Sequence, residues 1–213
     1  GLILDLRGNG GGDAGEAAQL LSIFIQQGPL FVFKNHMQPT GYSSIPQIPK
    51  FMGPIVVLVD EGSASASELV AATLQDFGRA IIVGPKQTFG KGTNQAVYPI
   101  GEAGGLRVTQ GTFHSVGGGT PQHVGVQPDV VLAEMSAGVR LEKDLPGNAI
   151  PPESISSFLQ VEHPYLPNHD VIMDLLSKQS AARRAANPAW AEVDESKDLL
   201  KNADLVTQEG DDV

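Results

Sequence analysis

Two short apolar segments of this chain each run into a turn of small residues and then into a helical pattern, which strongly constrains how it can fold. Segment 2–6 leads through a run of glycines to a first helix start, and segment 54–59 leads to a second at about residue 65. Apolar residues three and four positions apart follow both turns, which is typical of helices. A further apolar strand is expected over 80–83. Strands that alternate with helices indicate an α/β core.

The second turn contains alternating serines, in the order Ser63-Ala64-Ser65-Ala66-Ser67-Glu68. This pattern predicts a helix with Ser65 as its N-cap and Glu68 as the capping-box partner. The Ser65 hydroxyl would then lie beside the unpaired N–H groups of the first turn, at the positive end of the helix dipole. Such groups can stabilise an oxyanion, which favours a nucleophilic role. A capping role alone is the alternative for Ser65.

Lys91 lies between Gly90 and Gly92, about one helix and one strand after Ser65. A serine hydroxyl is a poor nucleophile near neutral pH, and a lysine amine can take its proton once the ammonium is desolvated. Flanking glycines let the backbone turn sharply and approach other parts of the chain closely. The sequence therefore predicts a serine nucleophile with a lysine base.

A second glycine cluster, Gly8-Asn9-Gly10-Gly11-Gly12, follows the first apolar segment. Successive glycines expose backbone N–H groups, and such a turn can bind a phosphate or the oxyanion of a tetrahedral intermediate. No Gly-Lys-Ser/Thr follows, so the cluster is not a phosphate loop, and its spacing does not match the dinucleotide-binding pattern.

Four blocks in order carry a resemblance to a known family. They are Asp5-Leu6-Arg7 with Asn9-Gly10-Gly11-Gly12; Ser63-Ala64-Ser65-Ala66-Ser67-Glu68; Thr88-Phe89-Gly90-Lys91-Gly92 with Gln95; and Gly119-Thr120-Pro121-Gln122 with Gly125-Val126-Gln127-Pro128-Asp129. Together they resemble the C-terminal processing peptidases, also called tail-specific proteases, a family of Ser/Lys serine proteases. The resemblance covers residues 1 to about 133.

The resemblance implies that Ser65 is the nucleophile, Lys91 the general base, and Gln95 the group that orients the lysine amine. The remaining implied positions are an oxyanion hole at Gly11, Gly12 and Ala66, and positions important for activity at Glu68 and Thr88. One extra residue over 84–88 lengthens the separation between serine and lysine relative to the family. No metal and no cofactor are implied.

Asp76 falls where some members of the family have an aspartate assigned to a charge relay. It follows Ser65 by eleven residues, which is about 16 Å along a continuous helix at about 1.5 Å per residue. A direct hydrogen bond between the two side chains is therefore excluded. The alternative is a structural carboxylate that pairs with Arg79 or caps a turn.

The implied architecture is the ββα core shared by the Clp-protease and crotonase superfamily, with a C-terminal, mostly helical extension. We expect a protease catalytic core over 1–133, a linker over 134–153, and a helical C-terminal region over 154–213. Within the core, 34–51 is expected to be an extended loop, and 95–132 to hold paired strands. The clearest amphipathic face of the C-terminal region is Val171, Ile172, Leu175 and Leu176.

The chain opens inside an apparent strand without an initiator Met, which suggests a piece of a longer protein. Full-length members of the family carry an export signal, a helical N-terminal region and a peptide-binding PDZ domain before this point. Neither a signal sequence nor a PDZ domain is expected in this sequence, and no apolar run approaches a membrane span. The resemblance implies the bacterial periplasm or cell envelope as the compartment.

The net charge of −10 is unevenly distributed. Residues 1–133 carry nine acids and seven bases, whereas 134–213 carry fifteen acids and seven bases. The acidic end argues against binding to nucleic acid or anionic membranes. There is no cysteine, and hence no disulfide. The expected partners are polypeptide substrates with apolar C-termini, with a homo-oligomer or an adaptor protein left open.

Three alternatives remain at this stage. His114 lies on a strand-like run and could serve as the base of a Ser/His pair. A crotonase-type enzyme would use the glycine-turn amides to hold the oxyanion of a coenzyme A thioester, without a Ser/Lys pair. A catalytically inactive scaffold or fragment would keep the fold and bind a partner.

Overall fold

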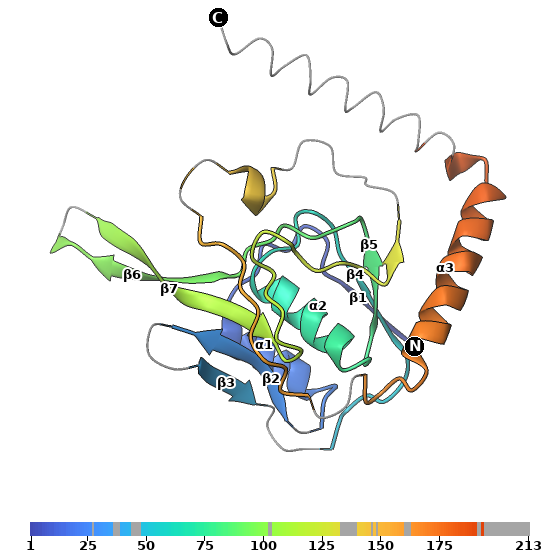
Figure 1. Cartoon of the computed structure of the whole chain (residues 1–213), viewed down its shortest axis with the longest axis horizontal. Helices are drawn as coiled ribbons and strands as arrows, with labels where there is room; N and C mark the ends of the chain where they lie inside the picture. Colours follow the sequence, from blue (N-terminus) through green and yellow to red (C-terminus); the bar gives the residue numbers. More distant parts are fainter. Residues whose placement is uncertain are drawn as a thin grey trace, which may run out of the picture.

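The computed structural model describes residues 1–26, 28–35, 39–43, 48–101, 104–132, 140–145, 147, 149–159, 163–190 and 193. In this part of the chain, two four-stranded sheets enclose two helices, and a third helix lies outside (Figure 1). The expected α/β class is confirmed.

The first sheet is parallel, with strand order β1-β4-β5-β8. Its strands are β1 (Leu2–Asp5), β4 (Ile55–Leu58), β5 (Ile81–Gly84) and β8 (Val130–Val131). Parallel strands require crossover connections, and two of these are helices. The turns that leave β1 and β4 therefore meet at one edge of the sheet.

The second sheet is antiparallel, with strand order β3-β2-β7-β6. Its strands are β2 (Pro29–Lys34), β3 (Pro39–Ser43), β6 (Thr93–Pro99) and β7 (Gly105–Ser115). The β6–β7 hairpin extends well beyond the body of the molecule (Figure 1). Its register shifts between Asn94 and Gln95, and irregular pairing of this kind re-aims side chains next to functional sites.

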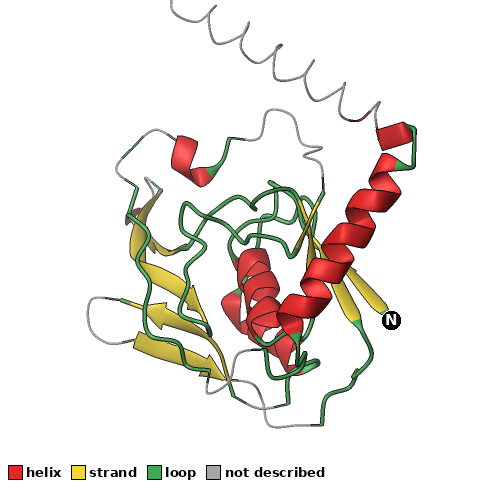
Figure 2. Ribbon diagram, turned by 45° about the vertical axis from the view of Figure 1, so that its right-hand side comes forward, coloured by secondary structure: helices red, strands yellow, loops and turns green. Residues whose placement is uncertain are grey.

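The helices α1 (Ala14–Ser22) and α2 (Ala66–Asp76) lie between the two sheets (Figure 2). Helix α2 contacts β2 and β7 on one side and β5 on the other. Eight of its residues are buried, as expected for a helix enclosed by other layers. Its aliphatic side chains, together with those of α1 and the inward faces of both sheets, form one core. The start of α2 is therefore held rigidly.

Helix α3 (His169–Ala185) packs on the outside of the parallel sheet, against β8. The amphipathic face expected here is only partly correct: Ile172 and Leu176 are half-buried, whereas Val171 and Leu175 are 70% and 53% exposed. The preceding segment crosses the end of α2, where Tyr165 packs edge-on against Phe77. Residues 194–213, including the acidic end, lie outside the described residues.

Two other expectations need correction, and the segment predicted to be a linker holds one turn that contacts the core. The predicted extended loop over 34–51 contains β3, which pairs with β2 in spite of its proline. The paired strands expected over 95–132 end with β7, because β8 joins the parallel sheet instead. The predicted linker over 134–153 includes a 3-10 turn, η2 (Glu142–Asp144), whose Glu142 N–H donates to Phe89 O at 3.0 Å. The contacts of β8 and η2 join segments distant in sequence, which local pattern does not encode, whereas β3 forms a hairpin with the neighbouring β2.

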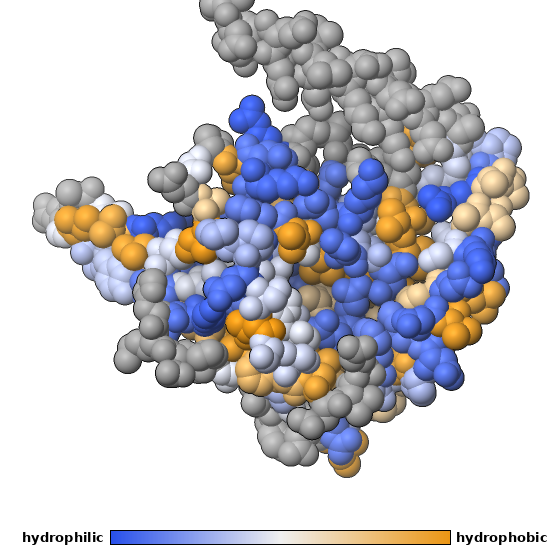
Figure 3. All heavy atoms as spheres, in the orientation of Figure 1, coloured by the Kyte–Doolittle hydropathy of each residue, from blue (hydrophilic) through white to orange (hydrophobic). Residues whose placement is uncertain are grey.

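Surface composition is mixed on the face shown in Figure 3, where apolar side chains gather towards the projecting end of the hairpin. Among the helices that the structure describes, none combines the length and the apolar character needed to cross a bilayer.

Leu74 tests the central position of α2. Its side chain is completely buried, so Leu74→Ala should leave a cavity and lower the free energy of unfolding by about 3 kcal/mol. Urea unfolding followed by circular dichroism measures this. The control is Leu175→Ala on the exposed side of α3, which should change stability by less than about 0.5 kcal/mol. Equal effects of the two substitutions would contradict the layer arrangement.

Candidate active site

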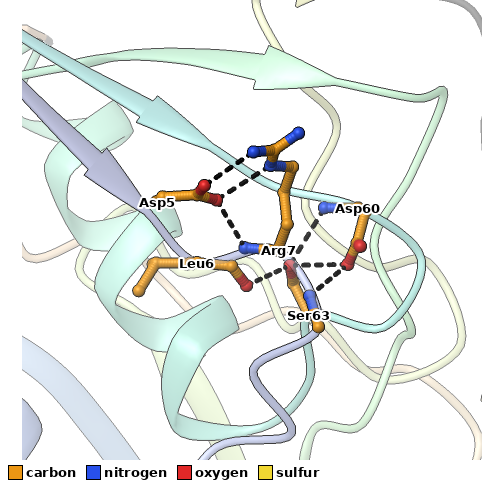
Figure 4. Close-up of polar contacts among 6 residues, drawn as sticks. Asp5, Leu6, Arg7, Asp60 and Ser63 are labelled. Atoms are coloured by element: carbon orange, nitrogen blue, oxygen red, sulfur yellow. Dashed lines mark hydrogen bonds and ion pairs between the residues drawn. The ribbon is translucent and has the colours of Figure 1, made fainter.

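A polar network joins the turns that follow β1 and β4 (Figure 4). The Asp60 carboxylate accepts from Gly8 N–H at 2.8 Å, and Ser63 Oγ accepts from Asp60 N–H at 3.0 Å. Ser63 Oγ also lies 2.8 Å from Leu6 O, to which it donates. The bonds of Gly8 and Leu6 span more than fifty residues of sequence, and they fix the glycine turn against the serine turn.

Arg7 and Asp5 form an exposed bidentate pair in the same network, with nitrogen–oxygen distances of 2.9 and 2.7 Å. The hydrogen bonds from Arg7 lower the pKa of the Asp5 carboxyl to about 2. This ion pair lies at the solvent-exposed start of the glycine turn and does not line the cavity described below.

Gly11 makes the closest approach between the two turns. A Cβ atom built on it would lie 2.7 Å from Ala64 O, 2.8 Å from Ser65 Cβ and 2.9 Å from Ala66 N. Its φ is +97°, a conformation that side chains disfavour. Only glycine allows the backbone of the first turn to lie directly on the backbone around Ser65.

Ser65 has an unusual backbone conformation, with φ 58° and ψ −116°. A non-glycine residue held there stores about 1–3 kcal/mol of strain, which the surroundings must offset. The Glu68 carboxylate helps to stabilise this conformation by accepting a hydrogen bond from the Ser65 N–H at 2.8 Å. The expected N-cap position of Ser65 and its partnership with Glu68 are therefore confirmed. A sharp strand-to-helix turn of this type displays a side-chain oxygen at the helix start.

Glu68 is completely buried and accepts four hydrogen bonds. Oε1 accepts from Thr88 Oγ1 at 2.5 Å and from Gly90 N–H at 2.7 Å. Oε2 accepts from Lys91 N–H at 2.9 Å, in addition to Ser65 N–H. Burial raises the pKa of the Glu68 carboxyl, and the four hydrogen bonds oppose that rise. One carboxylate thus ties the serine turn to the lysine loop.

The Lys91 amine is partly buried, and Nζ donates to Thr93 O at 3.2 Å. Burial lowers the pKa of the ammonium below its ordinary value of 10.5. The carboxylates of Glu142 and Glu68 oppose this change, and the Arg107 guanidinium adds to it. Because the partner at Thr93 is a neutral carbonyl, it positions the amine without the strong preference for the charged form that a carboxylate would impose.

Ser65, Lys91 and Gln95 line one cavity of about 580 Å³. Gln95 does not bond directly to the lysine among the interactions of the described residues. Its Nε2 donates instead to Thr93 Oγ1 at 2.8 Å, so its link to the amine runs through Thr93. The structure thus brings the predicted nucleophile, base and orienting residue to one cavity, and Thr93 connects the base to the orienting residue.

The positions expected to form the oxyanion hole separate into two groups. Gly12 and Ala66 line the cavity, and their N–H groups have no acceptor among the described residues. The Gly11 N–H, by contrast, donates to Asn9 Oδ1 at 3.0 Å, and Gly11 does not line this cavity. Gly11 therefore shapes the turn in this structure, and its amide is already occupied.

Asp76 lies at the far end of α2 from Ser65, outside the cavity. Its carboxylate accepts from Gly117 N–H at 2.7 Å. Burial raises the pKa of this carboxyl, against hydrogen bonds from Ser115 and Gly117. The structure thus places it as a cap on the turn after β7. The pairing with Arg79 that we considered does not form, because Arg79 donates to backbone carbonyls instead.

His114 is completely buried in β7 and does not line the cavity. Its Nε2 lies 3.0 Å from Thr112 Oγ1, and burial lowers the pKa of the imidazole. The structure therefore does not bring His114 to Ser65, and the Ser/His alternative is wrong for this arrangement.

Three residues at or near the lysine were missed by the sequence analysis. Thr93 holds the Lys91 amine through its backbone carbonyl, an interaction that residue identity does not reveal. Arg107 enters the cavity from β7, and Glu142 approaches Lys91 from η2. Arg107 and Glu142 reach this site through contacts between segments distant in sequence. For Arg107, its place on a predicted strand close to the lysine block was a usable signal. Across the described ranges, no three His, Asp or Glu side chains cluster in a way that could hold a metal ion.

Comparisons with known proteins bear on this arrangement. The sequence model of peptidase family S41 matches residues 1–132. The carboxy-terminal-processing protease of Bartonella bacilliformis is 37% identical over 140 residues, which is 63% of this chain and 31% of that protein. The tail-specific protease of Haemophilus influenzae is 32% identical over 203 residues, which is 91% of this chain and 29% of that protein.

Among solved structures, a photosystem II D1 C-terminal processing protease superposes with a TM-score of 0.57 at 35% identity. The match covers 62% of this chain and 34% of that one. The chain therefore spans about a third or less of the length of the relatives that it matches. The similarity agrees with the Clp-protease-like core that the sequence implied.

Glu68→Gln tests the role of the buried carboxylate. Whichever way the amide is oriented, its NH₂ group would face two of the four donors, which lose their acceptor. Each buried group without a partner costs about 1–3 kcal/mol, so we expect a loss of about 3 kcal/mol in unfolding free energy. Denaturant unfolding measures it, with the exposed Glu16→Gln as a control that should stay within about 0.5 kcal/mol. Equal stability of the two variants would show that Glu68 does not join the turns.

Gly11→Ala tests the close contact between the turns. The added methyl group would meet three atoms at less than 3.0 Å, two of them backbone atoms, at a φ that disfavours alanine. We expect a loss of about 2 kcal/mol or more in stability. Gly10→Ala is the matched control, because a Cβ there has no neighbour within 4 Å and its φ is outside the left-handed region. A Gly11→Ala variant as stable as Gly10→Ala would contradict the packing described.

Proposed function

The chain belongs to peptidase family S41, and from this premise we propose that it is the catalytic core of a serine endopeptidase that processes polypeptides near their C-termini. One observation carries the proposal. Ser65, on a strained turn at a helix start, and Lys91, an amine with a lowered pKa, line the same cavity. A nucleophile and a desolvated base in one cavity are the two parts that acyl transfer needs.

In the proposed acylation step, neutral Lys91 takes the proton of the Ser65 hydroxyl. The hydroxyl oxygen forms a bond to the scissile carbonyl carbon, and the carbonyl electron pair moves onto its oxygen. The amine donates to Thr93 O at the same time, which leaves its lone pair for the serine. The tetrahedral intermediate then collapses, the C–N bond breaks, and the new ammonium of Lys91 gives its proton to the leaving amine.

The oxyanion would be held by the N–H groups of Gly12 and Ala66. Both line the cavity, and Ala66 is the first residue of α2. The N-terminus of α1 lines the same cavity, so the positive ends of two helix dipoles are directed at one place. Preorganised donors of this kind typically supply about 10²–10³-fold in rate each. We assign Gly11 a shaping role because its N–H is taken by Asn9.

Deacylation would repeat the proton transfer with water in place of serine. Lys91 removes a proton from the water, the hydroxide attacks the acyl carbon, and the proton passes to Ser65 Oγ as the ester bond breaks. The acid product leaves, and the serine hydroxyl is restored. The step requires no group beyond those that already line the cavity.

The substrate would bind as an extended strand along β6. This strand forms the edge of the antiparallel sheet, and its first residues line the cavity. Pairing with an edge strand reads the backbone of a peptide more than its side chains, which favours broad specificity. We propose unfolded polypeptides with apolar C-termini as substrates, and the bacterial cell envelope as the compartment, in keeping with the bacterial tail-specific relative.

Cleavage of an unfolded protein with an apolar C-terminus tests the proposal. The full-length protein should cleave it, and Ser65→Ala and Lys91→Ala should each lose about 10³-fold or more in kcat/KM. The wild-type rate should rise with pH, because only the neutral amine is a base, and it should do so below pH 10.5 since burial lowers the Lys91 pKa. Retained activity in Lys91→Ala would refute the dyad, and an inert wild type would favour the scaffold.

Glu142→Gln tests the electrostatic environment of Lys91 in the same experiment. The Glu142 carboxylate favours the charged form of Lys91, so removing its charge should move the rising limb of the profile to lower pH. Asp144→Asn is the matched control, because it removes one charge from the same turn and does not act on the lysine. A profile that moves equally in both variants would indicate a general charge effect rather than contact with Lys91.

A further inference from the structure

Arg107 is a charged residue of the cavity wall that the proposed chemistry leaves unused. It lies on β7 directly across from Val97 of β6, and both side chains line the cavity that holds Ser65 and Lys91. Figure 1 shows that this part of the hairpin leads away from the body of the molecule. The guanidinium lies on the cavity wall, on the strand next to β6, from which its long side chain can extend toward a peptide paired with β6.

No carboxylate neutralises Arg107 within the described part of the chain. The ion pairs found there involve other cations, namely Arg7, Lys34, His169 and Lys178. Among the described residues that line the cavity, the acidic one is Asp13, whose carboxylate caps α1 by accepting the Glu16 N–H at 3.0 Å. An exposed guanidinium that has no hydrogen-bond acceptor among the described residues is suited to a planar, two-oxygen anion.

We propose that Arg107 is a specificity residue that binds a carboxylate of the substrate, at a position about four residues from the scissile bond. This inference rests on the proposed function. The carboxylate is either an acidic side chain or the free C-terminus of the peptide, since both present the same two oxygens.

The ladder geometry sets the distance. Val97 lies four residues beyond Thr93, whose carbonyl holds the Lys91 amine. At about 3.3 Å per residue, the two positions are about 13 Å apart along β6, and a peptide paired beside the strand advances at the same rate. The neighbouring Val97 is 63% exposed and adds apolar contact beside the guanidinium. Apolar side chains also cover this part of the hairpin surface (Figure 3).

Two matched peptide pairs separate the sources of the carboxylate. The first pair carries Asp or Asn four residues from the scissile bond, tested on either side of it. The second pair ends four residues after the scissile bond, with a free carboxylate or with an amide. For each pair, the ratio of kcat/KM between the acidic and the neutral peptide is measured in the full-length protein and its variants, so an effect of a substitution on the lysine that is the same for both peptides cancels.

We expect the acidic member of at least one pair to be preferred by about tenfold. Arg107→Gln should bring that ratio to about one, and Arg107→Lys should keep part of it, because charge remains and the two-pronged geometry is lost. Arg183→Gln, on exposed α3, removes the same charge far from the cavity and should leave the ratio unchanged. Added salt should lower the wild-type ratio, as for any exposed ion pair.

The outcomes are distinguishable. A preference in the first pair alone assigns the contact to an acidic side chain, and one in the second pair assigns it to the free C-terminus. Equal cleavage of all peptides by the wild type, or a ratio that survives Arg107→Gln in a variant with wild-type thermal unfolding, would overturn this inference alone. A wild type that cleaves none of the peptides would overturn the proposed function and this inference with it.

Discussion

The buried carboxylate of Glu68 is the interaction on which the rest of the site depends. Its two oxygens accept from the serine turn and from the lysine loop, segments separated by more than twenty residues. A neutral side chain cannot replace it, because four donors converge on one group and only an ionised carboxylate accepts on every side. Burying an ionised carboxylate has a desolvation cost, and the four hydrogen bonds offset it.

The Glu68 carboxylate also stabilises the strained backbone of Ser65. The backbone of a non-glycine residue in this conformation is held from two directions, by the carboxylate of Glu68 below and by Gly11 packed against it. Because Glu68 is completely buried on α2, which the two sheets enclose, the turn cannot lose this support without disturbing the core. The result is a hydroxyl displayed at a fixed point beside the first N–H of α2.

Local pattern predicted the parts of the site that depend on short-range geometry. The start of α2, the cap at Ser65 and its bond to Glu68 follow from helix periodicity and capping preferences, and the α/β class follows from alternating elements. The roles of Thr93 and Gly11 could not be predicted, because one acts through a backbone carbonyl and the other through the absence of a side chain. Glu142 was assigned to a linker, since nothing local shows that η2 packs on the lysine loop.

Strand β6 connects the chemistry to recognition. Its first residue holds the lysine amine, its edge is open to an incoming peptide, and its partner β7 brings Arg107 across from Val97. Burial has the largest effect on Lys91 and lowers its pKa, Arg107 lowers it further, and Glu142 opposes both. A substrate carboxylate bound to Arg107 would therefore cancel part of the electrostatic effect that lowers the Lys91 pKa. Binding at the hairpin and reactivity at the serine are then coupled through one guanidinium, because an acidic peptide bound there would raise the Lys91 pKa and lower the fraction of neutral amine at a given pH.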